Sequence, residues 1–72
     1  MPIINLKMTK GRTKEQKQRF VEGVTSLAVE ILNVKPEWVT VIIDEYDRNN
    51  WATDGILHSI KFGDGYGKNG TV

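Results

Sequence analysis

The feature that most constrains this chain is a long apolar stripe at helical spacing, placed between two short segments typical of strands. A capping-box pattern at Thr13 and Gln16 predicts the start of the helix, which continues to about Leu32. Residues 2–8 alternate apolar and polar side chains, and residues 39–46 form a run rich in β-branched residues, which predicts a strand buried on both faces. The stripe consists of Phe20, Val21, Val24, Leu27, Ala28, Ile31 and Leu32.

The order strand, helix, strand predicts one βαβ unit with parallel strands and a right-handed crossover, in the α+β class. Asn33 is expected to end the helix in a left-handed conformation, and residues 36–38 to form a short helical turn that begins with proline. Residues 51–58 predict a C-terminal hairpin around Asp54 and Gly55.

The chain is too small to cover its own sheet, so we expect it to associate. It has 72 residues, with a predicted domain at 1–62 and a glycine-rich tail at 63–72 that is either mobile or ordered by a neighbouring subunit. Domains of this size bury only about 60% of the surface of the unfolded chain. With no cysteine and one histidine, neither a disulfide nor a structural zinc site is available. A second copy is therefore predicted to cover the open sheet edges and the apolar face, giving sheets shared between subunits.

Composition argues against several classes of partner. The formal net charge is +1, from 10 basic and 9 acidic residues, so no nucleic acid partner is expected. No apolar stretch approaches the ~20 residues of a membrane span, so no membrane partner is expected either. We predict no cofactor and no metal, and the absence of cysteine fits a cytoplasmic protein.

Pro2 is the first candidate catalytic residue. The initiator methionine is normally removed when the second residue is small, which would leave a free secondary amine. An apolar pocket with nearby cations would lower the pKa of this amine and make it a general base near neutral pH. The alternative interpretation is a proline that merely begins an edge strand, where its missing N–H costs nothing.

Basic residues gather where the helix begins. Lys10, Arg12 and Lys14 lie beside the free amides of the first turn, and together these groups predict an anion site suited to a carboxylate. The alternative is a basic turn that is simply solvated.

Trp51 follows a polar turn and is a candidate wall of an active site, although ordinary packing is the other interpretation. Trp38 is expected to cover the turn between helix and strand. His58 has no partner at a recognisable spacing and is interpreted as surface or core filler. Asp44 and Glu45 should point to opposite faces of their strand, so they do not form a paired-carboxylate site.

Taken together, these segments resemble the 4-oxalocrotonate tautomerase family, from residue 2 to about residue 57. The matching parts are Pro2 with its apolar strand, G-R-T-x-E-Q-K at 11–17, the long helix, V-x-V-I-I-D-E at 39–45, Trp51 and the turn at Gly55. The resemblance implies a βαβ subunit that dimerises into a four-stranded sheet, with three dimers forming a homohexamer. A dimer is the other assembly considered.

The resemblance also implies an isomerase that moves a proton in small enolic or unsaturated keto acids. It assigns Pro2 as the base and Arg12 as the cation that binds a substrate carboxylate across a subunit boundary. Trp51 takes the place of an aromatic residue that keeps the proline amine neutral.

One position departs from the family pattern. The second strand of the family carries another arginine, where this chain has Thr40, and nothing in the sequence places Arg48 in that role. Two other functions therefore remain open at this stage. One is a hydratase or dehalogenase of the same superfamily, and the other is a non-catalytic oligomer that binds a small molecule.

Overall fold

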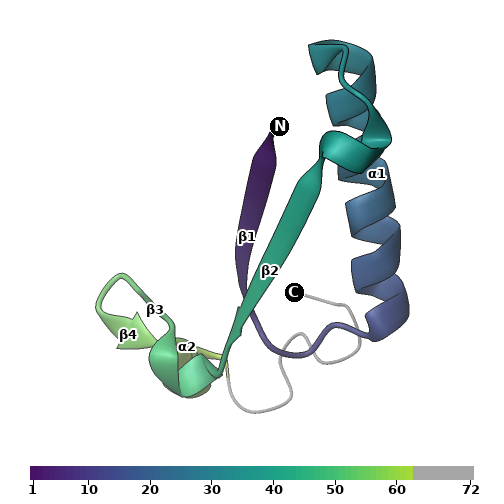
Figure 1. Cartoon of the computed structure of the whole chain (residues 1–72). Coiled ribbons are helices and arrows are strands. Elements are labelled where there is room, and N and C mark those ends of the chain that lie inside the picture. Colours follow the sequence, from purple (N-terminus) through teal and green to yellow (C-terminus); the bar gives the residue numbers. More distant parts are fainter. Residues whose placement is uncertain (63–72) are drawn as a thin grey trace.

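A computed structural model of the chain describes residues 1–62, so the glycine-rich tail predicted at 63–72 lies outside the described residues (Figure 1). The elements in chain order are β1 (Ile3–Thr9), α1 (Lys14–Leu32), the 3₁₀ turn η1 (Pro36–Trp38), β2 (Thr40–Tyr46), the 3₁₀ turn η2 (Arg48–Asn50), β3 (Ala52–Thr53), β4 (Ile56–Leu57) and α2 (His58–Lys61).

The chain folds as the predicted βαβ unit with a C-terminal hairpin. Strands β1 and β2 pair in parallel, in a register that runs from Ile3 opposite Thr40 to Thr9 opposite Tyr46. Helix α1 lies along one face of this two-stranded sheet (Figure 1). Both strands begin one residue later than predicted.

Side chains at its two ends fix the length of α1. The Thr13 hydroxyl accepts a hydrogen bond from the Gln16 amide at 3.1 Å, and the Gln16 side-chain oxygen accepts one from the Thr13 amide at 2.8 Å. Together they satisfy two amides that have no partner within the helix, which confirms the predicted capping box. Asn33 ends the helix with φ 55°, as predicted.

The apolar stripe of α1 is wider than the face that its own sheet covers. Ala28 is the buried residue of the described core, with only 7% of its surface exposed. The other side of the stripe stays open to solvent, with Phe20 46% and Leu27 55% exposed. On the far face of the sheet Ile42 is 44% exposed, so the prediction that the second strand is buried on both faces is wrong for the single chain.

The hairpin that follows η2 turns at Asp54 and Gly55, as predicted. Their φ angles are 57° and 74°, and two successive positive values are typical of the turn that suits a two-residue hairpin loop. Strands β3 and β4 pair antiparallel and lead directly into the single-turn helix α2. The sequence did not predict α2.

Within residues 1–62, no helix is long and apolar enough to cross a membrane. The same residues contain no group of three or more potential metal-binding side chains.

Candidate active site

The three predicted site residues lie at two opposite ends of the sheet. Pro2 immediately precedes β1, and its carbonyl accepts a hydrogen bond from the Thr40 amide at 3.1 Å. At the other end the Lys10 amide donates to the Tyr46 carbonyl at 2.8 Å, and Arg12 follows two residues later. The seven residues of β1 span about 20 Å at the usual rise of a strand, so one chain does not bring Pro2 and Arg12 together.

Pro2 is half-buried, while Met1 before it is 89% exposed. Thr40, at the position where the resembled family has its second arginine, is exposed and lies at the same end of the sheet as Pro2. This end therefore carries a hydroxyl where the family pattern carries a cation.

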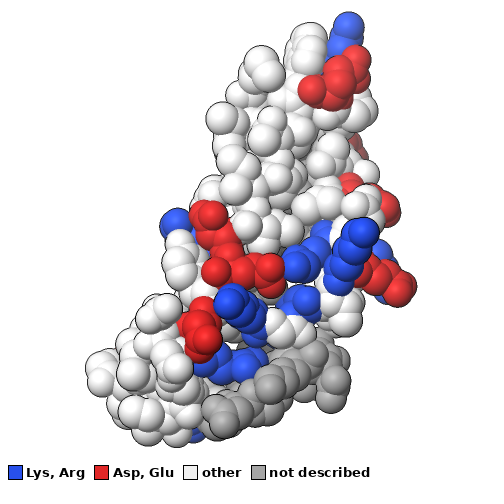
Figure 2. All heavy atoms as spheres, turned by 60° about the horizontal axis from the view of Figure 1, so that its bottom comes forward, with Lys and Arg blue, Asp and Glu red and all other residues white. Residues whose placement is uncertain are grey.

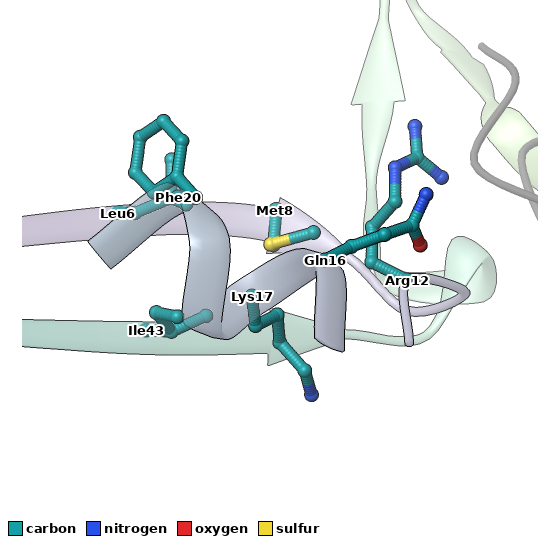
Figure 3. Close-up of a pocket in the computed structure, with 7 residues that line it drawn as sticks. All are labelled: Leu6, Met8, Arg12, Gln16, Lys17, Phe20 and Ile43. Atoms are coloured by element: carbon teal, nitrogen blue, oxygen red, sulfur yellow. The ribbon is translucent and has the colours of Figure 1, made fainter. Parts of the chain in front are cut away.

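Arg12 is half-buried and borders a cavity of about 220 Å³ between the first half of α1 and the sheet (Figure 3). In Figure 3 Arg12 stands at the end of the cavity opposite Leu6 and Phe20. The cavity is lined by Leu6, Met8, Arg12, Gln16, Lys17, Phe20 and Ile43. An apolar hollow with a guanidinium at one end is chemically suited to a small organic acid.

Gln16 and Lys17, which also line this cavity, have partners within the chain. Gln16 belongs to the capping box, and Lys17 Nζ lies 2.9 Å from a carboxylate oxygen of Glu45 on β2. Figure 2 shows acidic side chains interleaved with basic ones across the middle of the view, and no continuous basic face.

Trp51 is half-buried within an aromatic cluster formed by Tyr46, Trp51, His58 and Phe62. Its ring centroid lies 5.9 Å from that of Tyr46, the last residue of β2, so Trp51 is at the same sheet end as Arg12. His58 is therefore packed against other side chains, which agrees with the core interpretation and not with the surface one. Ala52 pairs with Leu57, so the next pair outward in the hairpin register is Trp51 and His58. A hairpin register drawn from the sequence could therefore have placed His58 beside Trp51.

A polar network lies on the exposed face of the sheet. Asp44 accepts hydrogen bonds from the Asn5 side chain at 3.0 Å and from Lys7 at 3.3 Å, and Lys7 is also 3.2 Å from the Tyr46 hydroxyl. The hydrogen bond from Asn5, followed by that from Lys7, lowers the pKa of Asp44. The Tyr46 hydroxyl and then Asp44 raise the pKa of Lys7. Glu45 pairs instead with Lys17 on α1, which confirms that Asp44 and Glu45 point to opposite faces.

Comparisons with known proteins agree on one family. A family model described as "Tautomerase enzyme" matches residues 2–59. A probable tautomerase of Helicobacter pylori is 47% identical over 58 residues, which covers 76% of this chain and 85% of the relative. The 2-hydroxymuconate tautomerase of Bacillus subtilis is 38% identical over 55 residues, which covers 76% of this chain and 89% of the relative.

A solved structure shares the fold. It is the heterohexamer 4-oxalocrotonate tautomerase from Chloroflexus aurantiacus, which superimposes with a TM-score of 0.79 at 27% identity. The match covers 82% of this chain and 95% of that one.

Proposed function

This chain belongs to the tautomerase family, and from that premise we propose that it is an isomerase that uses Pro2, freed by removal of Met1, as a general base. Its substrates are small enolic or unsaturated keto acids. The observation that carries the proposal is that the family match begins at Pro2 and continues through Arg12 and Trp51. We propose residues 1–62 as the catalytic domain.

The separation of Pro2 from Arg12 leads us to propose a site built from two chains. Within residues 1–62, β1 pairs only with β2, so its other edge is available to a second copy. Two β1 strands paired antiparallel about a twofold axis would set Pro2 of one chain beside the partner's Arg12. The same pairing would double the sheet to four strands.

The exposed apolar residues support this assembly. Phe20, Leu27 and Ile31 recur at helical spacing on one side of α1 and are 46%, 55% and 71% exposed, which leaves an apolar surface for a second copy to cover. A related protein of the same fold is a heterohexamer. We propose a homo-oligomer here, either a homohexamer or its constituent dimer.

The chemistry then follows from the properties of each side chain. Arg12 binds the substrate carboxylate through charge-assisted hydrogen bonds, which fixes the reacting carbons beside Pro2. The neutral amine of Pro2 removes a proton, becomes a cation, and returns that proton to another carbon of the same substrate. Trp51, at the Arg12 end, excludes water and so disfavours the charged form of the amine, which lowers the pKa of Pro2.

Thr40 changes how the substrate charge is shared. A hydroxyl at the Pro2 end offers a hydrogen bond but no positive charge, so Arg12 carries more of the substrate's negative charge than it would beside a second arginine.

The direct test is turnover by protein whose intact mass shows that Met1 is absent. The panel contains 2-hydroxydienoates and phenylenolpyruvate-like enols, and proton transfer is followed by absorbance. Protein that retains Met1 is the matched control, because its Pro2 nitrogen is an amide and is not basic. Activity in the trimmed protein alone is expected, and equal activity in both forms would refute the role of Pro2.

A further inference from the structure

We propose that His58 is a positioning residue for Trp51, holding the indole in the orientation that forms the apolar wall of the active site. This inference rests on the proposed function, because that function places Trp51 at the wall. His58 contributes contacts to Trp51 and none to the substrate.

The indole of Trp51 has an aromatic neighbour from each of two elements. The Tyr46 ring of β2 lies 5.9 Å away at an interplanar angle of 55°, and the His58 ring of α2 lies 6.3 Å away at 57°. The His58 amide also donates to the Trp51 carbonyl at 2.8 Å. His58 therefore holds both the backbone and the ring of Trp51.

The imidazole is itself held by groups other than Trp51. Its Nε2 atom lies 3.0 Å from the Thr53 hydroxyl, and its ring meets the edge of Phe62 at 4.9 Å and 84°. Thr53 and Trp51 are two residues apart in the chain, so they share one face of the extended hairpin arm. The imidazole is therefore held against the hairpin by contacts that do not depend on the indole.

The hairpin explains why such a contact is needed. Strands β3 and β4 have two residues each, and a hairpin this short has little stability of its own. The turn at Asp54 and Gly55 brings the chain back beside Trp51, and the contacts of His58 with Trp51 hold the two arms of the hairpin together. Without the ring at 58, the indole would lose its contact at 6.3 Å and retain the one with Tyr46, and water would reach it.

The test uses fluorescence and kinetics on the same variants. In a Trp38→Phe background Trp51 is the single tryptophan, so its emission reports its own surroundings. His58→Ala should shift that emission to longer wavelength and increase its quenching by acrylamide. It should also lower kcat about two- to tenfold, the factor that one aromatic contact is worth, with little change in KM because Arg12 still binds the carboxylate.

Two further variants separate the ring from its hydrogen bond. His58→Phe keeps the ring contact and should restore most of both signals. Thr53→Val removes the hydroxyl and should give a smaller change in the same direction. Ser59→Ala, the neighbouring position on α2, is the matched control and should behave as the wild type.

The possible results either support or overturn the role of His58. Unchanged emission and unchanged kcat in His58→Ala would overturn the proposal, and so would equal loss in His58→Ala and His58→Phe, which would give the imidazole a role of its own. If the wild type shows no turnover on any substrate, the proposed function fails. The emission of Trp51 would then still show whether His58 positions it.

Discussion

The two ends of the β1–β2 sheet are built very differently. The end at which the strands begin is open at β1, although η1 lies directly before β2: one hydrogen bond joins Pro2 to Thr40, and Ile3 is 69% exposed. The end at which the strands finish carries a capped helix start, a cavity beside Arg12 and the aromatic cluster around Trp51. In the proposed mechanism the bare end supplies the amine of Pro2, whereas the elaborate end supplies the groups that bind and shield the substrate. Neither end is a complete site, which is why we assign the chemistry to a pair of chains.

Replacing Pro2 tests the bare end and should have the largest effect. Pro2→Ala keeps an amine at the N-terminus but makes it primary, with different basicity and geometry. Loss of a positioned general base costs about 10²–10⁴-fold in rate. Turnover of mass-verified protein measures it, with unchanged circular dichroism to show that the fold persists. Pro36→Ala, at the other proline of the chain, is the control, and an undiminished rate in Pro2→Ala would remove Pro2 from the mechanism.

Replacing Arg12 tests the elaborate end. Arg12→Ala should lower kcat/KM for carboxylate substrates about ten- to a hundredfold, because a hydrogen bond to a charged group is lost. The methyl ester of the same substrate should be affected far less. Arg19→Ala, at an exposed arginine of α1, is the control. Equal losses on acid and ester would assign anion binding to another group.

Mixing the two impaired variants tests whether the ends cooperate between chains. Pro2→Ala and Arg12→Ala protein, unfolded together in equal amounts and refolded, should regain about a quarter of the wild-type rate. Half of the dimers are then mixed, and each mixed dimer holds one intact site of two. The two variants refolded separately are the control. A mixture no more active than its components would mean that each site belongs to a single chain.

The stability of the elaborate end depends on its capping box. Thr13→Ala should lower the free energy of unfolding by about 1 kcal/mol, because the side chain that accepts from the Gln16 amide is removed. Denaturant titration at one fixed protein concentration measures the change, since association also contributes to stability. Ser26→Ala, an exposed position within α1, should be neutral or slightly stabilising. A Thr13→Ala curve that overlays the wild type would show that the cap is not needed.

The smallest effect concerns the polar network between the two ends. Because the pKa of Asp44 is lowered in the folded chain, its contribution to stability is present above the pKa of the unfolded state and is lost as pH falls through the folded value. Carboxyl titration by NMR should show that Asn5→Leu raises this pKa more than Lys7→Met does, because the Asn5 hydrogen bond is the larger cause. The reverse order would make Lys7 the main partner.

Local patterns predicted the fold well where one or two side chains determine the backbone. Thr13 with Gln16, Asn33 after the helix, and Asp54 with Gly55 each favour a single local conformation, and each occurs as expected. The parallel pairing followed from the order of the elements, because a helix between two strands allows the return crossover.

The sequence was less informative about which surfaces meet. Helical spacing marked Leu27 and Ala28 as parts of one apolar stripe, yet Ala28 is buried within the chain and Leu27 is 55% exposed. Periodicity shows which side chains share an apolar face, but it does not show which neighbour covers that face. For the same reason the sequence did not predict that Ile42 is exposed in the single chain. The contacts of His58 could not be predicted for a related reason. Its partners come from a hairpin and a helical turn whose packing no local pattern specifies.

The position of Pro2 and Arg12 at opposite ends of β1 also has an evolutionary consequence. If this gene were duplicated, one copy would be free to lose its proline and the other its arginine, provided that the two products still assembled. Each sister protein would then be inactive alone and indispensable to the other. The length of a single strand would thus turn a self-sufficient gene into a pair that natural selection must keep together.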